Sequence, residues 1–208
     1  MAEDSFVLDP AVTAYMKSDA FSSAAILVKR AFSWIFSRTA TEAAAASTTG
    51  VLGAVTDNGS DRDITSGFTN PPCPRNITVT FGGTAADVKA ITVTVYGTNI
   101  NDAAISETFL ATVNTADTKT GNKAFKTVNR VTIPAHDGTG ATTAIGFGDK
   151  LGLPMLLSEN TNFRTHLGGT LEGTAATVAT STSALESNTI DLNSALNGSA
   201  VVAYFLTV

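Results

Sequence analysis

From residue 50 onward, hydrophobic and polar residues follow one another in short runs that favour β-strands. The clearest run is Ile91–Tyr96 (ITVTVY), in which Ile91, Val93 and Val95 fall on one face of a strand and the alternate residues fall on the other. Nine further runs rich in Val, Ile, Thr and Phe predict strands at Val51–Val55, Asp63–Phe68, Asn76–Phe81, Ala104–Ala111, Lys126–Ile133, Ala144–Phe147, Leu171–Thr180, Thr189–Leu192 and Ala200–Thr207.

Turn-forming residues separate these runs. Asn101-Asp102, Gly121-Asn122 and Asn197-Gly198 favour positive φ angles or side-chain-capped turns. No helical pattern alternates with the runs after residue 50. The sequence therefore predicts a mainly β fold, with an antiparallel β-sandwich or barrel-like domain over residues 50–208.

The first 49 residues have a different pattern. Asp9-Pro10 is typical of a helix start, with Asp9 as the N-cap and Pro10 at the first helical position. The apolar stretch Ala24–Phe36 fits helical spacing and strand alternation equally well, so its period leaves both structures open. Ala40–Gly50 (ATEAAAASTTG) is expected to be a hinge of small residues. We therefore predict an N-terminal arm, helical or extended, over residues 1–49.

Aromatic residues are concentrated in this arm. Three of them, Phe32, Trp34 and Phe36, occur within five residues, and Phe21 precedes them. Exposed aromatic side chains on an extended segment suit insertion into a groove or a sheet of another subunit. The sequence therefore predicts that Phe21, Phe32, Trp34 and Phe36 are assembly contacts.

Composition and charge restrict the classes of partner. Charged residues make up 15% of the chain and the net charge is −5, with no run of Lys or Arg to contact phosphates, so no nucleic-acid partner is expected. The longest apolar stretch, Ala24–Phe36, is interrupted by Lys29 and Arg30 and is too short to span a bilayer, so no membrane partner is expected.

Residues able to carry catalysis are few and scattered. His136 is predicted to be an exposed loop residue and His166 a hydrogen-bonded structural residue, and neither belongs to a nucleophile motif. Glu107 is predicted to point outward from its strand, without the second carboxylate that glycoside hydrolysis needs. We expect no catalytic residues and no enzymatic activity.

Metal and cofactor motifs are also incomplete. The single cysteine, Cys73, lies between prolines in a connector, and one cysteine with two histidines excludes a Cys/His zinc site. Asp57, Asp61 and Asp63 do not have the spacing of a calcium loop. Gly146-Phe-Gly148 lacks the spacing and the helix of a phosphate cradle. No metal site, cofactor-binding site or cofactor is expected.

Three stretches together resemble structural proteins of tailed bacteriophages. Phe68–Val88 contains FTNPPCPRNITV and GGTAADV, which is similar to a segment of these proteins with the pattern NP..PRN(V/I)TVT..GTA.D(I/V). Ile91–Phe109 resembles their VTVTGTDxxGxxISET hairpin, with Asn101-Asp102 in place of a turn that contains Gly. Phe125–Pro154 is similar to their F.TV..ITIPAH…GDKLGLP signature. The resemblance covers residues 65–157.

This resemblance implies a non-enzymatic virion protein of the head decoration or head fibre-like β-domain family. The first expectation is a capsid decoration (cement) protein on the outer surface of the head, assembled in the host cytoplasm and bound to the major capsid protein or other virion proteins. A homo-oligomer is expected, with a trimer favoured by local threefold symmetry. The alternatives are a neck or tail adaptor, collar or fibre-attachment protein, and a virion carbohydrate-binding module.

Overall fold

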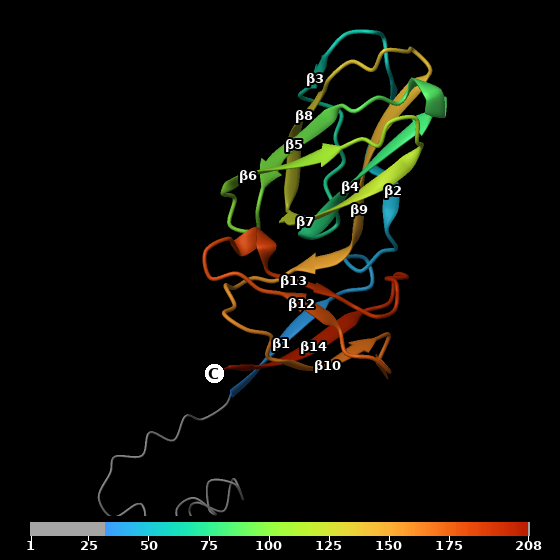
Figure 1. The fold of residues 1–208 in the computed structure, drawn as a ribbon. Coiled ribbons are helices and arrows are strands. Elements are labelled where there is room, and N and C mark those ends of the chain that lie inside the picture. The colour runs from blue at the N-terminus through green and yellow to red at the C-terminus, as the bar shows by residue number, and fades with distance from the viewer. Residues whose placement is uncertain (1–31, 208) are drawn as a thin grey trace, which may run out of the picture.

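The computed structural model describes residues 32–207, which form fourteen β-strands and two short 3-10 helices, η3 (Ala85–Asp87) and η4 (Leu185–Ser187). All strand pairings are antiparallel. Figure 1 shows a tall sandwich above a smaller sheet that contains the first and last strands. The predicted mainly β, antiparallel fold is confirmed. Among the described residues, no helix is long and apolar enough to cross a membrane.

The largest sheet has six strands in the order β12-β13-β9-β4-β7, with β2 also paired to β9. Its strands are β2 (Ser47–Thr56), β4 (Arg75–Gly83), β7 (Asp117–Phe125), β9 (Ala141–Gly152), β12 (Thr177–Ala179) and β13 (Thr189–Asp191). The long strand β9 pairs with β4 over most of its length. It therefore links the upper and lower parts of the molecule in Figure 1.

A four-stranded sheet packs against the upper part of this sheet. Its order is β3-β8-β5-β6, with β3 (Arg62–Ile64), β5 (Thr92–Thr98), β6 (Ala104–Leu110) and β8 (Thr127–Ile133). Val93 and Val95 are fully buried between the sheets, opposite Val79 and Ile145 of the larger sheet, in what we call the sandwich core. The alternation predicted for Ile91–Tyr96 is confirmed, because its apolar face is buried and its threonine face is not.

The third sheet, here called the terminal sheet, closes the lower end of the molecule. Its order is β1-β14-β10-β11, with β1 (Phe32–Arg38), β10 (Asn162–Leu167), β11 (Thr170–Leu171) and β14 (Val201–Thr207). A second group of buried apolar residues, the terminal core, lies between this sheet and the ends of β9 and β13, and includes Phe36, Leu151, Ile190 and Phe205. Leu151 belongs to β9, so that strand contributes to both cores.

The structure corrects the predicted boundary between arm and domain. Residues 32–38 form strand β1, which pairs with β14 over seven residues, so the open choice between helix and strand is settled as strand for this part of Ala24–Phe36. The predicted hinge is packed: Ala43 is completely buried in a turn closed by the hydrogen bond from Ala43 N–H to Thr39 C=O, 2.9 Å. Residues 32–49 therefore belong to the folded body, and residues 1–31 lie outside the described residues.

Two strands, β7 and β10, were not predicted. Gly121-Asn122, predicted as a turn, lies within β7, where the register against β4 shifts between Asn76 and Thr78. The extra residues form a bulge, which allows a strand to continue through residues that favour turns. The predicted turn at Asn101-Asp102 is present between β5 and β6, and Asp102 has a positive φ of 62°.

Candidate interaction surface

The terminal sheet has a buried inner face that fixes its strands. On β14, Ala203 and Phe205 are fully buried. On β1, Phe36 is 3% exposed, and the Trp34 ring stacks on Phe205 with centroids 4.4 Å apart and an interplanar angle of 14°. Stacked aromatic pairs add about 0.5–1.5 kcal/mol to the free energy of area burial. The first and last described strands are thus held together by aromatic packing.

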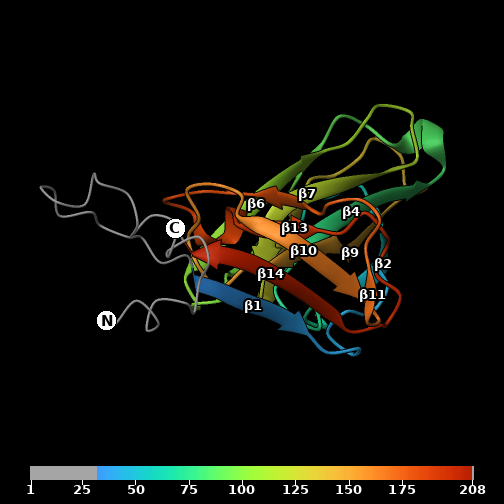
Figure 2. The same cartoon turned by 90° about the horizontal axis from the view of Figure 1, so that it is seen from below.

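The outer face of the same sheet exposes large apolar side chains. Ile35 is 59% exposed, Phe163 55%, Leu171 52% and Leu206 40%, with Tyr204 half-buried among them. Figure 2 shows β1, β14 and β10 side by side across this end of the molecule. With about half of four large side chains exposed, the face offers on the order of 400 Å² of apolar surface, comparable to the largest patch on a typical soluble monomer.

Aromatic contacts order this outer face. The Tyr204 ring lies 6.1 Å from the Phe163 ring and 5.8 Å from the His166 ring, between centroids. Arg164 is exposed on the same strand as His166 and is the register partner of Tyr204. A pre-ordered apolar surface with few charged groups is the usual composition at the centre of a protein interface.

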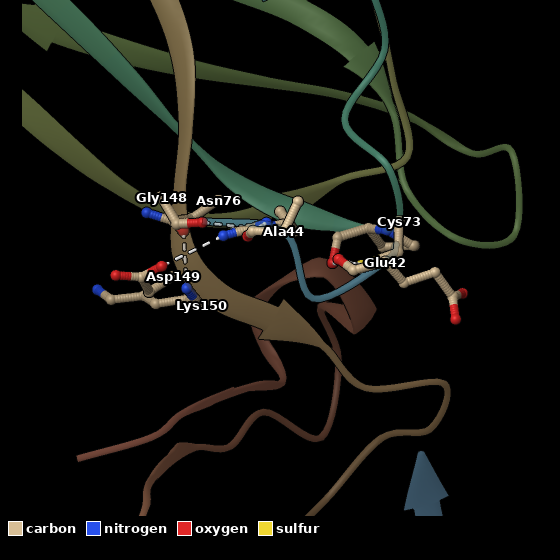
Figure 3. A network of polar contacts seen from close by, with 9 residues as sticks. Glu42, Ala44, Cys73, Asn76, Gly148, Asp149 and Lys150 are labelled. Atoms are coloured by element: carbon tan, nitrogen blue, oxygen red, sulfur yellow. Dashed lines mark hydrogen bonds and ion pairs between the residues drawn. The ribbon is translucent and has the colours of Figure 1, made fainter. Parts of the chain in front are cut away.

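A buried arginine joins strand β9 to the connector between β1 and β2. Arg75, at the start of β4, has no exposed surface. Its Nε donates to the Gly148 carbonyl at 2.7 Å and its Nη1 to the Ala44 carbonyl at 2.6 Å, while Nη2 lies 3.3 Å from Asp149 Oδ1. Figure 3 shows Ala44, from the connector that precedes β2, close to Gly148 and Asp149, which are adjacent on β9. The guanidinium also lies 4.7 Å from the centroid of the Phe147 ring.

The next residue, Asn76, extends this connection to strand β7. Its Nδ2 donates to the Gly121 carbonyl at 3.1 Å, and its Oδ1 accepts from the Lys150 backbone N–H at 3.0 Å. Asn76 is fully buried, and both ends of its amide are satisfied at the register shift in β4 and β7. Together, Arg75 and Asn76 fix β9 at the level where the two cores meet.

The predicted assembly contacts are only partly placed by the structure. Phe21 lies outside the described residues, and Phe32 is described by its backbone, which pairs with β14. Trp34, partly buried, and Phe36 pack against the terminal core within their own chain, because β14, distant in sequence, provides a partner for their apolar face. Whether either residue also contacts another subunit stays a prediction.

The exposed apolar residues of the outer face were missed at the sequence level. Alternation within the predicted strand Ala200–Thr207 puts Tyr204 and Leu206 on one face, which was the available signal. Ile35 and Phe163 gave no comparable signal, because their strands were either ambiguous or not predicted.

His136 is buried, and its prediction as an exposed loop residue is wrong. It is 4% exposed, and its Nδ1 accepts a hydrogen bond from the Lys89 backbone N–H at 3.0 Å. Its own backbone N–H donates to Asp57 Oδ2 at 2.7 Å. Burial lowers the pKa of His136, while the negative charges of Asp57 and Asp137 oppose that shift. The buried neutral ring therefore braces the loops at the upper end of the sandwich.

The side chains of His166 and Glu107 are also engaged. His166 is half-buried and packs edge-on against Tyr204. Glu107 was predicted to point outward, but it is half-buried and its carboxylate accepts from the Asn122 N–H at 2.7 Å. A Cβ on Gly121 would overlap this carboxylate, so a larger residue there would have to displace the Glu107 side chain. Burial raises the pKa of Glu107, against hydrogen bonds that lower it.

The remaining candidate groups hold loops in place. Asp61 accepts from the Ala135 N–H at 2.9 Å and Asp63 from Arg130 Nε at 2.7 Å. Cys73 is buried in the terminal core, with its Sγ 3.4 Å from the Glu42 carbonyl oxygen, and burial raises the pKa of its thiol. Within residues 32–207, no group of three or more His, Cys, Asp or Glu residues is placed to hold a metal ion.

An open groove of about 470 Å³ lies between the β5–β6 turn and η4. Its buried amide, Asn99, donates to Glu186 Oε2 at 3.3 Å and accepts from two backbone N–H groups of its own turn. These polar groups satisfy one another, so the groove has the character of a junction between loops.

Comparison with protein-family models, with curated proteins and with solved structures gives no match. The function therefore has to be inferred from the residues themselves, and within residues 32–207 the outer face of the terminal sheet is the candidate interaction surface.

Proposed function

We propose that the chain is a non-enzymatic structural protein of a tailed-bacteriophage virion. In this proposal it acts as a capsid decoration protein that binds assembled capsomers and stabilises the head. The observation that carries the proposal is the apolar outer face of the terminal sheet, where Ile35, Phe163, Leu171 and Leu206 are each at least 40% exposed.

The size of this face supports a role in assembly. Burial of roughly 400 Å² of apolar surface at about 25 cal/mol/Å² is worth on the order of 10 kcal/mol before the costs of association. Those costs are estimated at about 4–15 kcal/mol. A single copy that binds through this face alone is therefore expected to bind weakly. Firm binding needs further contacts, from neighbouring copies or from other segments of the chain. Copies of a decoration protein lie side by side on a capsid lattice, so each can gain such contacts from its neighbours.

The virion assignment rests on the motifs within residues 65–157. Structural placement of these motifs is consistent with a purely structural role: Arg75 and Asn76 of the PRN segment connect the two cores, and Asp149 and Leu151 of the GDKLGLP segment lie at the same junction. The negative net charge favours the outside of a shell that encloses DNA, because like charges repel.

The experiment is a count of copies in purified virions by quantitative mass spectrometry. We expect hundreds of copies per particle for a decoration protein, whereas a closed neck ring would contain about a dozen or fewer. The smaller number would transfer the proposal to the neck or tail alternative, and absence from the virion would overturn it.

Matched variants test the binding surface. Leu171→Asp places a charge on the outer face of the terminal sheet, and Leu110→Asp places one on β6 of the sandwich, where the leucine is similarly exposed (60% against 52%). Particles assembled without the chain should bind Leu110→Asp like wild type and lose Leu171→Asp. Equal binding of both variants would show that the outer face is not the contact.

A further inference from the structure

Within residues 32–207, strand β1 is an unprotected edge of the terminal sheet. Among the described residues it pairs with β14 alone, over seven residues with no shift in register. Its sequence, FSWIFSR, contains no proline and has one charged residue, Arg38, at the end of the strand. The Arg38 guanidinium lies 4.4 Å from the centroid of the Phe36 ring of the same strand. A long, regular, apolar edge is a template for pairing with another strand.

The other edges in the described part of the chain have protection that β1 lacks. Strands β3, β11 and β12 have only two or three residues, and β2 and β7 are interrupted by register shifts. Strand β6 is regular, but Lys123 Nζ donates to its Ser106 carbonyl at 2.9 Å and Glu107 binds the β7 bulge. Short length, bulges and charged side chains are the usual ways to prevent edge pairing.

The sequence of β1 is self-complementary about its centre. In an antiparallel pairing with a twofold axis at Ile35, Ile35 lies opposite Ile35 of a second copy. Trp34 then lies opposite Phe36 of the second copy, and Ser33 opposite Ser37. Trp34 and Phe36 belong to the inner face and Ile35 to the outer face, so each pair joins residues of the same face. Cross-strand aromatic and β-branched pairs are favourable on a sheet.

We propose that β1 pairs with β1 of a second copy of this chain, forming a twofold dimer with a continuous eight-stranded sheet. Such pairing joins the two outer faces across the axis into a single apolar surface of on the order of 800 Å². An isologous contact of this kind closes with two chains, so this edge supports a dimer and not the trimer expected from the sequence. The inference does not depend on the proposed capsid role.

The expected strength follows from the size of the contact. Pairing of one seven-residue edge buries less than the roughly 800 Å² per partner of a standard stable interface. We therefore expect a dimer that dissociates on dilution. Sedimentation analysis of the full chain from about 1 to 100 μM should show a mass that rises from 21.3 kDa towards twice that value.

Charge variants test the twofold register. Ile35→Lys places two ammonium groups opposite each other on the axis, whereas in the single chain the side chain is 59% exposed and tolerates charge. We expect this variant to stay monomeric over the whole concentration range. Leu171→Lys, on β11 at the opposite edge of the same sheet, should dimerise like wild type. An equimolar mixture of Ile35→Lys and Ile35→Glu should recover the dimer mass.

A cross-linking measurement covers the case in which Ile35→Lys fails to fold, as checked by its melting curve. Ile35→Cys should form an intermolecular disulfide under mild oxidation, and Leu171→Cys should not. The proposal is overturned if the wild-type chain is monomeric at the highest concentration, if it forms a trimer, if folded Ile35→Lys dimerises like wild type, or if Ile35→Cys fails to cross-link.

Discussion

Replacement of Arg75 by methionine tests the connection between the two cores. Methionine has a comparable length but no donors, so the substitution leaves the carbonyls of Gly148 and Ala44 without their hydrogen bonds of 2.7 and 2.6 Å. It also removes the ion pair with Asp149, which is 30% exposed and can turn towards solvent. The expected loss is therefore set mainly by two carbonyls, the buried one of Gly148 and the part-buried one of Ala44.

The magnitude follows from those contacts. A buried acceptor left without a partner costs about 1–3 kcal/mol. The Gly148 carbonyl is in that class, whereas the Ala44 carbonyl is part-buried and costs less because water can reach it. Burial of the guanidinium is itself unfavourable and lowers the pKa of Arg75, so its removal offsets part of this cost, as when buried ion pairs are replaced by apolar residues. We expect a net destabilisation of about 2 kcal/mol, which for a domain of this length corresponds to roughly 6 °C in melting temperature.

The assay is urea unfolding followed by fluorescence and by circular dichroism. The chain has one tryptophan, Trp34, and it stacks on Phe205 in the terminal sheet, so its emission reports on that sheet. Circular dichroism reports on all strands. Because Arg75 holds the junction, we expect the fluorescence transition of Arg75→Met to move to lower urea at least as far as the dichroism transition.

A matched control separates this effect from the loss of any arginine. Arg130 also binds an aspartate, Asp63, and lies over an aromatic ring, that of Tyr96, but both members of the ion pair are about half exposed. Exposed ion pairs contribute little to stability because solvent screens them, so Arg130→Met should change the free energy of unfolding little. If the two variants lose the same free energy of unfolding, burial at the junction does not determine the cost of replacing an arginine.

Three further outcomes are expected. A chain that begins at Gly50 lacks β1 and should lose the melting transition of the terminal core, whereas a chain that begins at residue 32 should keep this transition. Equal melting of the two chains would show that β1 does not contribute to the fold. His136 has a lowered pKa in the folded state, so the unfolded chain binds a proton first as the pH falls below about 6.5. Wild-type stability should therefore fall between about pH 6.5 and the lower folded pKa, by at most about 1.4 kcal/mol per pH unit, and His136→Gln should flatten this slope in urea titrations. Cys73 should react with a thiol reagent only at the rate of unfolding, and rapid labelling of the native chain would show that the terminal core opens locally.

The sequence was sufficient to predict strands in which buried apolar residues alternate regularly with polar residues. Val93 and Val95 are examples, since their alternation depends only on local period and a nearby opposing sheet. Strand β7 was missed because its run, DTKTGNKAF, is polar on its exposed side and interrupted by a bulge that Glu107 and Asn76 stabilise from other strands. Local residues do not encode those distant hydrogen bonds.

The interaction surface was less accessible to prediction than the fold. The aromatic residues of β1 looked available because their partner, β14, lies at the other end of the chain. The same pairing that buries Trp34 and Phe36 turns Ile35 outward. Likewise, the sequence shows Arg75 only as one residue of a motif. Its complete burial depends on contacts with two distant segments, the Gly148 carbonyl and the turn at Ala44.

The pairing of the first and last described strands has a consequence for biosynthesis. The partner of β1 begins at Val201, so a chain growing on the ribosome exposes β1 until β14 has been translated. Contacts between distant segments form slowly because a long loop has to close first. During that interval Phe36 and Trp34 are uncovered and prone to associate with other nascent chains. The sandwich can form earlier, since its strands β2 to β9 are complete by Gly152, so folding is expected to proceed from the middle of the molecule towards its two ends.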